Sequence, residues 1–110
     1  MNRNYNEKVL ERNKMVYKIS NKKFVIEGKK WFDKINGNTY HSVKIIDTNT
    51  NQEIAEIPFN YGYGEQWKQT AYDELIKKGL AKEKDRFNHE LNRKRFIFVG
   101  GNYVTRKKDL

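Results

Sequence analysis

The hydrophobic pattern predicts three consecutive β-strands in the first half of the chain, over residues 22–32, 39–46 and 52–59. The first is predicted from its run of β-forming residues, and the other two from alternating apolar and polar positions. The connection before the second strand contains Asn36-Gly37, a pair that tolerates the positive φ of tight hairpin turns. The connection before the third strand, residues 47–51, is rich in Asn, Thr and Asp, which favour turns. Two such short connections predict a three-stranded antiparallel meander with one buried face.

A helix is predicted over residues 65–78, where Trp67, Ala71 and Leu75 recur every four residues. Gly79 suits the position directly after the end of this helix. We expect the apolar stripe of the helix to pack on the buried face of the sheet. The residues expected to meet there are Val43, Ile45, Ala55, Ile57 and Phe59 from the strands and Trp67, Ala71 and Leu75 from the helix.

The C-terminal part of the chain has a weaker pattern. Residues 81–95 are highly charged and allow one short helix. Residues 95–99 predict a fourth strand, followed by a turn at Gly100-Gly101-Asn102 and a further extended pair, Tyr103-Val104. Pro58 lacks a backbone donor, so its end of the third strand is expected at a sheet edge or at the strand end.

The N-terminus supports two alternatives: residues 6–17 form a short capped helix, or residues 1–21 form a mobile basic arm. The predicted fold class is α+β, a three- to four-stranded antiparallel sheet packed on one main helix. An extra N-terminal helix is an option, and a short helix precedes the last strand. The 110 residues are expected to form a single domain with a basic tail at 105–110.

Charge is concentrated at the two ends of the chain. The net charge of +9 is divided into +6 over residues 1–30, −2 over 31–80 and +5 over 81–110. This asymmetry favours a polyanionic partner, either nucleic acid or an acidic protein surface. The alternative is a lysine-rich surface that serves solubility. The absence of cysteine, and of any run near the ~20 apolar residues of a membrane span, fits a cytoplasmic protein without membrane contact.

Basic clusters and tyrosines form the predicted binding surface. If the first and fourth strands are neighbours, the basic groups could form one continuous face on which arginines pair with phosphates. The tyrosines of the loop 61–64 either stack on bases or cap the core. Both tryptophans, Trp31 and Trp67, are expected in the core. The candidate residues for binding nucleic acid or a partner are Lys22, Lys23, Lys29, Lys30, Tyr61, Tyr63, Arg93, Lys94, Arg95, Tyr103, Arg106, Lys107 and Lys108.

Residues with catalytic chemistry are sparse. His41 and Ser42 are adjacent in a predicted strand, so their side chains point to opposite faces and cannot pair directly. No spacing of His, Cys or carboxylates suits zinc, and Asp33 and Asp47 are explained by their turns. We therefore predict a structural or surface role for His41. We predict no catalytic residue, no metal site and no cofactor, which indicates a binding protein rather than an enzyme.

Several short motifs occur together between residues 24 and 78. They are Lys30-Trp31-Phe32-Asp33-Lys34, Asn36-Gly37-Asn38-Thr39-Tyr40-His41-Ser42-Val43, Tyr61-Gly62-Tyr63-Gly64 and Gln69-Thr70-Ala71. In combination they resemble a family of small uncharacterised proteins encoded by bacteriophages and prophages. The resemblance implies an accessory phage protein that acts inside the bacterial cell, and it brings no biochemical activity with it.

The order helix–strand–strand–strand–helix also resembles the double-stranded-RNA-binding domain, whose last helix opens with a lysine cluster. Residues 65–69 stand at that position here and contain one lysine, so the likeness is one of topology. We predict a small non-catalytic phage-type accessory protein that binds nucleic acid or a nucleic-acid-bound host complex. One form of it is a counter-defence, anti-CRISPR-like inhibitor. The alternatives are a small nuclease or nuclease subunit that uses scattered carboxylates and His41, and a structural or oligomerising phage component.

Overall fold

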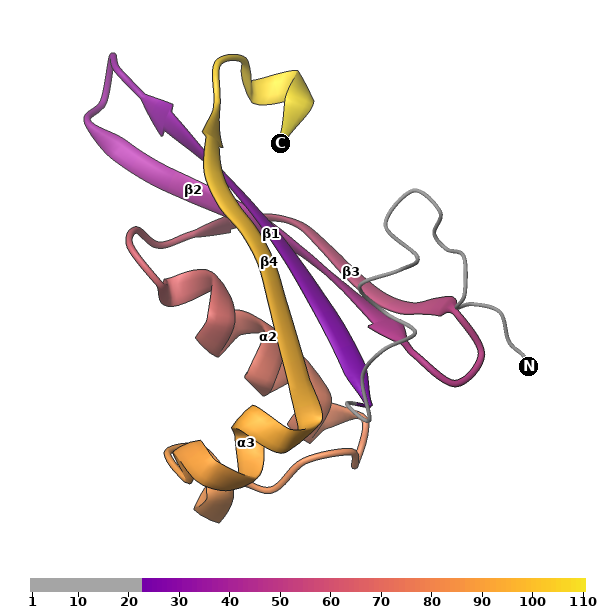
Figure 1. The fold of residues 1–110 in the computed structure, drawn as a ribbon. Helices are drawn as coiled ribbons and strands as arrows, with labels where there is room; N and C mark the ends of the chain where they lie inside the picture. The colour runs from indigo at the N-terminus through magenta and orange to yellow at the C-terminus, as the bar shows by residue number, and fades with distance from the viewer. Residues whose placement is uncertain (1–22) are drawn as a thin grey trace.

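Four β-strands form one mixed sheet in the computed structural model, which describes residues 23–110 (Figure 1). The strands are β1 (Phe24–Asp33), β2 (Asn38–Asp47), β3 (Gln52–Tyr61) and β4 (Phe96–Val104). Their order across the sheet is β3-β2-β1-β4. β2 is antiparallel to both β1 and β3, which confirms the predicted meander, whereas β4 is parallel to β1. The expectation of a purely antiparallel sheet is therefore wrong.

The helical segment between β3 and β4 explains the parallel pairing. It contains α2 (Gln66–Lys77), the short 3-10 turn η1 (Glu83–Asp85) and α3 (His89–Arg95). β1 and β3 run in the same direction because each is antiparallel to β2. A helical connection carries the chain back along the sheet, so β4 starts at the same end as β1. The α+β class is confirmed, and α2 is the predicted main helix.

Most predicted boundaries agree with the structure to within two residues. Gly79 follows α2 with a φ of 75°, as expected for the residue after a helix. The predicted turn at 100–102 is wrong, because β4 continues through it with a register shift against β1. Residues 1–22 lie outside the described part of the chain, and with them the predicted helix over 6–17, the alternative basic arm and Lys22.

One face of the sheet packs against α2 and contains the main core. The buried cluster comprises Phe24, Ile26, Val43, Ile45, Trp67, Ala71, Tyr72, Leu75 and Phe96, and Ala55 and Ile57 pack against it. This arrangement confirms the predicted helix-on-sheet packing for every residue but Phe59.

Phe59 lies on the opposite face because the register of β3 shifts beside Pro58. From Ile57 to Asn60, β3 uses one residue more than β2 does between their partners. The extra residue reverses the direction in which the following side chains point. β3 is an edge strand, which confirms the position expected for Pro58.

Trp67 joins α2 to both β1 and β4. Its side chain is 3% exposed and lies over Gly28 of β1 and against Gly101 of β4. A Cβ atom at Gly28 would overlap the Trp67 ring, and one at Gly101 would lie 3.0 Å from it. Gly101 also has a φ of 85° and is the residue that the β1–β4 register skips. The two glycines are therefore required for the close approach of the indole to the sheet.

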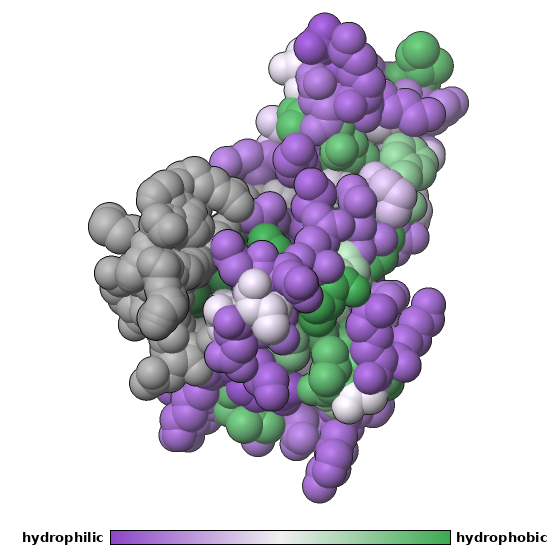
Figure 2. All heavy atoms as spheres, turned by 90° about the vertical axis from the view of Figure 1, so that its right-hand side faces the viewer, coloured by the Kyte–Doolittle hydropathy of each residue, from purple (hydrophilic) through white to green (hydrophobic). Residues whose placement is uncertain are grey.

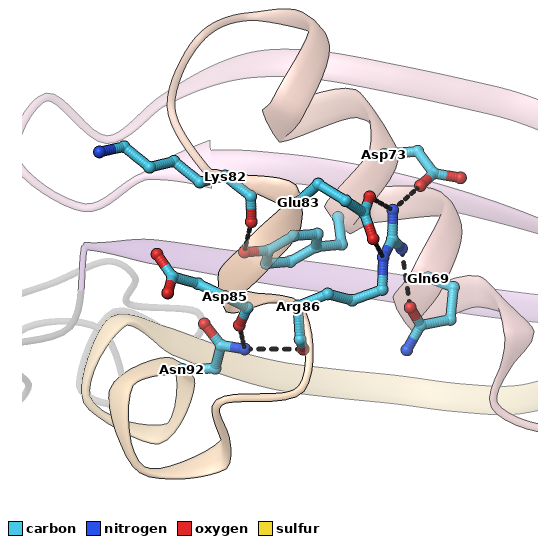
Figure 3. A network of polar contacts seen from close by, with 8 residues as sticks. Gln69, Asp73, Lys82, Glu83, Asp85, Arg86 and Asn92 are labelled. Atoms are coloured by element: carbon cyan, nitrogen blue, oxygen red, sulfur yellow. Dashed lines mark hydrogen bonds and ion pairs between the residues drawn. The ribbon is translucent and has the colours of Figure 1, made fainter.

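A network of polar contacts around Arg86 fastens the segment that follows α2 (Figure 3). Arg86 donates two hydrogen bonds to the Glu83 carboxylate, at 2.9 and 2.7 Å. It donates two more to α2, at 2.8 Å to Gln69 Oε1 and 2.5 Å to Asp73 Oδ1. Its guanidinium lies 5.0 Å from the centre of the Tyr72 ring. These charge-assisted bonds hold the connection to α3 against α2.

The same contacts set the protonation of the pair. The hydrogen bonds from Arg86 lower the pKa of Glu83 below its ordinary value of 4.5. The hydrogen bonds to Glu83 and then to Asp73 raise the pKa of Arg86. A carboxylate with a lowered folded-state pKa stabilises the fold above its unfolded pKa, and this contribution is lost as the pH falls through the folded value. The network therefore stabilises the fold fully at a pH above the ordinary pKa of Glu83, 4.5, and stabilises it less in acid.

The contact between Trp67 and Gly28 predicts a coupled pair of substitutions. Gly28→Ala should lower the free energy of unfolding by roughly 1–3 kcal/mol, because the added methyl group overlaps the indole. In a Trp67→Ala background the same change should cost much less, since the clash is gone. Urea unfolding of the four proteins of this cycle measures the coupling. Equal costs in both backgrounds would contradict the close approach.

The Arg86 network predicts a pH-dependent loss of stability. Arg86→Gln should lower the melting temperature by several degrees at neutral pH, because the charged pairs and the Tyr72 contact are lost. The difference from wild type should shrink as the pH falls below the ordinary pKa of Glu83, 4.5. Lys94→Gln is the control, since its ion pair with Glu90 is open to solvent and should contribute little. A gap that stays constant into acid would contradict the role of Glu83.

Candidate nucleic-acid interface

Exposed aromatic and basic side chains gather at one end of the sheet. We call this the distal end and define it as residues 29–42, 59–64 and 102–110, which the strand registers bring together. It holds seven of the fifteen aromatic residues, with six basic and two acidic residues among them. Figure 1 shows the β1–β2 turn and the C-terminus at this end and α3 at the other. On the side that Figure 2 shows, hydrophilic side chains surround several small hydrophobic patches.

Three aromatic side chains stack across the sheet on the face opposite α2. Trp31 of β1 lies 5.9 Å from Tyr40 of β2, and Tyr40 lies 4.5 Å from Phe59 of β3, measured between ring centres. Tyr61 contacts Tyr40 edge-on at 5.8 Å. The side chains of Phe59 and Tyr61 are 44% and 61% exposed. We call Trp31, Tyr40 and Phe59 the aromatic row, and it leaves part of its ring surface open.

The C-terminal turn, residues 105–110, folds back over this face. Its 3-10 segment η2 (Lys107–Asp109) places Lys107 Nζ 6.0 Å from the centre of the Trp31 ring and 5.1 Å from that of Phe59. Lys29 Nζ donates to the Asp109 carbonyl at 3.4 Å, and Arg106 Nε donates to the Asp109 carboxylate at 3.1 Å. These contacts hold a cation across the aromatic row.

The turn between β1 and β2 lies within electrostatic reach of the same lysine. Hydrogen bonds from the side chain and backbone of Asn36 and the backbone of Ile35 lower the pKa of Asp33, and the charge of Lys107 lowers it further. Asp33 is therefore a carboxylate at neutral pH that fixes its turn, as the sequence predicts.

Lys30 differs from the role expected for it. Its side chain is buried, and its Nζ donates to the Gly64 carbonyl at 3.3 Å and lies 4.7 Å from the centre of the Tyr103 ring. Lys30 thus connects β1 to the loop before α2. The side chains of Tyr63 and Tyr103 are 71% and 57% exposed. Since Tyr61 and Tyr63 are both exposed, the alternative in which they cap the core is wrong.

The predicted basic residues form two groups rather than one continuous face. β1 and β4 are neighbours as required, but Lys23 and Arg93–Arg95 stand at the start of β4, and Arg106–Lys108 follow its end. The nine residues of β4 separate the groups by roughly 26 Å. Arg95 is engaged locally, donating to the Leu80 carbonyl at 2.6 Å and lying over Phe96. The group at the distal end is the one that meets the aromatic row.

The sequence pattern does not predict the aromatic row. The pattern predicts Trp31 in the core and Phe59 on the helix side of the sheet. Both lie on the face opposite α2, where Trp31 is half-buried. Pro58 carried a usable signal, because a proline inside a strand marks a bulge that changes the face of the next side chain.

His41 is fully buried between the sheet and α2. Its Nδ1 lies 3.0 Å from the Gly62 carbonyl, which can only accept, so Nδ1 carries a proton. Its Nε2 lies 2.7 Å from Thr70 Oγ1, and in the neutral ring it accepts the hydroxyl hydrogen. Asn60 Nδ2 donates to the same hydroxyl at 3.2 Å. His41 therefore ties β2 to the loop after β3 and to α2, which matches the structural role predicted for it.

Within residues 23–110, no three or more His, Cys, Asp or Glu side chains gather as a metal site would require. No helix in the same range has the length and apolar character needed to cross a membrane. Searches for similar proteins found no matching family model, no matching curated protein and no matching solved structure. Functional inference therefore depends on the geometry of the distal end.

The buried hydrogen bonds of His41 predict a stability loss when both ring nitrogens are removed. His41→Phe keeps a ring at this site but removes the donor to the Gly62 carbonyl and the acceptor of the Thr70 hydroxyl hydrogen, so it should cost about 1–3 kcal/mol. Thr70→Ser keeps the hydroxyl and should cost less than His41→Phe. Urea unfolding measures both. A His41→Phe protein as stable as wild type would show that these hydrogen bonds contribute nothing net.

Proposed function

We propose that this protein binds single-stranded nucleic acid at the distal end, with the aromatic row and Tyr61 as stacking surfaces and the neighbouring basic residues as phosphate contacts. The main support is the placement of Lys107 across the rings of Trp31 and Phe59. A cation beside exposed rings on an open sheet face offers the two interactions that single strands make without sequence readout, stacking and charge neutralisation.

The exposed aromatic surface favours a single strand over a duplex. Bases in a duplex are stacked on one another and present only their edges in the grooves. A single strand exposes the faces of its bases, and these can stack on Phe59 and Tyr61, which are the most open rings on the sheet face opposite α2. Lys29, Arg106 and Lys107 lie beside them on the same part of the molecule.

The charge distribution supports the same partner. The chain carries a net charge of +9, and the distal end has six basic residues against two acidic ones. Such a field attracts polyanions and raises the rate of encounter with them. Binding of this kind fits a phage-type accessory protein in the bacterial cytoplasm that engages nucleic acid or a nucleic-acid-bound host complex. Counter-defence inhibition is one biological form that such binding could take.

Variants of the aromatic row test the proposal directly. Phe59→Ala should weaken binding of a labelled single-stranded oligonucleotide by roughly 5- to 150-fold, because one base–aromatic stack contributes about 1–3 kcal/mol. Lys107→Gln should lower the slope of log K against log salt by about 0.7, the value for one phosphate contact on a single strand. Fluorescence anisotropy at several salt concentrations gives both quantities, and the oligonucleotide should be recovered intact.

Matched controls exist at the other end of β4. Phe87 is 70% exposed and Lys94 lies on α3, so Phe87→Ala and Lys94→Gln make the same chemical changes away from the distal end. They should leave affinity and salt slope near the wild-type values. A larger loss of affinity in the controls than in the distal variants would indicate that Arg93–Arg95 make the contact. Equal binding by all variants would refute the proposal. Cleavage of the oligonucleotide would favour the nuclease alternative.

A further inference from the structure

A cavity of about 420 Å³ opens on the same face of the sheet, beside the aromatic row. Its walls come from all four strands and from Leu110 of the C-terminal turn. This volume lies within the range of sites that hold small molecules. The hydrogen bond from Lys29 to the Asp109 carbonyl holds the C-terminal turn at its rim. We call this cavity the sheet pocket.

The charges around the sheet pocket balance one another. Lys44 of β2 pairs in register with Glu27 of β1 on one side and with Glu56 of β3 on the other. Side chains directly opposite in neighbouring strands lie close enough for their charges to interact. With Lys29, the lining has two lysines and two glutamates. A phosphate gains little net attraction in such a pocket, whereas an uncharged polar ring meets no penalty.

The polar and apolar groups of the pocket suit a flat ring with a polar edge. Val99, Val104 and Leu110 supply apolar wall. Ser42 and Asn102 supply side chains that can both donate and accept hydrogen bonds, as reading the edge of a base requires. Asn102 faces the pocket only because the β1–β4 register skips one residue after Gly28 and pairs Asn102 with Lys29.

The pocket and the aromatic row are adjacent along every strand that they share. Lys29 and Trp31 are two residues apart on β1, and Ser42 and Tyr40 are two residues apart on β2. Alternate residues of a strand share a face and are separated by about 6.6 Å. A base bound in the sheet pocket would therefore place the next base of the same nucleic acid beside the aromatic row.

We propose that the sheet pocket receives one unstacked nucleobase of the bound single strand and reads its edge through Asn102 and Ser42. This inference rests on the proposed function and adds base preference to it. The aromatic row and Lys107 supply affinity for any sequence, and the pocket supplies discrimination between bases. One bidentate contact to a base edge changes affinity about 5- to 150-fold between the right and the wrong base.

Homopolymeric oligonucleotides of equal length, as RNA and as DNA, test the pocket on the full chain. The wild type should bind the best and the worst homopolymer with affinities that differ by at least about fivefold. Asn102→Ala should reduce the ratio of these two affinities to the part that comes from differences in stacking and flexibility between the oligonucleotides. Lys107→Gln should weaken binding to all of them and keep the ratio. Comparing RNA with DNA shows whether the 2′-hydroxyl takes part.

Free nucleosides provide a second measurement that involves no phosphate. Titration of the ¹⁵N-labelled protein with each nucleoside should shift the amide resonances of Gly100 and Asn102 for the preferred base, and Ser42→Leu, which fills the pocket, should abolish the shift. Equal affinity for all homopolymers, or an unchanged ratio in Asn102→Ala, would overturn the pocket and leave the proposed function standing. If no oligonucleotide binds, the proposed function itself fails.

Discussion

The contact between Trp67 and the two glycines beneath it is the constraint on which the rest of the architecture depends. The indole reaches the sheet because Gly28 and Gly101 have no side chains, and it thereby joins α2 to β1 and β4 together. Its Nε1 is buried without a hydrogen-bond partner among the described residues, a cost that the close packing has to offset. Trp67 lies in the first turn of α2 and Gly28 in the middle of β1, so the strands continue past the helix into the distal end.

Two irregularities of the sheet then determine what the distal end presents. The shift beside Pro58 directs Phe59 away from α2, where it completes the stack with Tyr40 and Trp31. The extra residue at Gly101 directs Asn102 toward the same face. Bulges of this kind often re-aim side chains next to functional sites. The aromatic row and the sheet pocket thus depend on one inserted residue in each of two strands.

The C-terminal turn connects these two features. It places Lys107 across the aromatic row, and its last residue lines the sheet pocket. The Arg86 network acts at the opposite end, where it fixes the connection that brings α3 and β4 back to the start of β1. The Arg86 network and the aromatic row therefore lie at opposite ends of β4. Arg93–Arg95 lie at the end that holds the Arg86 network, and Arg106–Lys108 lie at the end that holds the aromatic row.

The sequence by itself determined the elements whose signal is local. The β-rich run of the first strand, the period of two in the second and third, the period of four at Trp67, Ala71 and Leu75, and the glycine after α2 all report backbone geometry within a few residues. Only the tertiary structure decided that β4 lies parallel beside β1, that Phe59 leaves the core and that 100–102 is a bulge rather than a turn. Strand pairing is a choice between distant segments, and a single inserted residue reverses every side chain after it. Neither effect leaves a periodic signal, so the face that a residue occupies is settled when the strands pair.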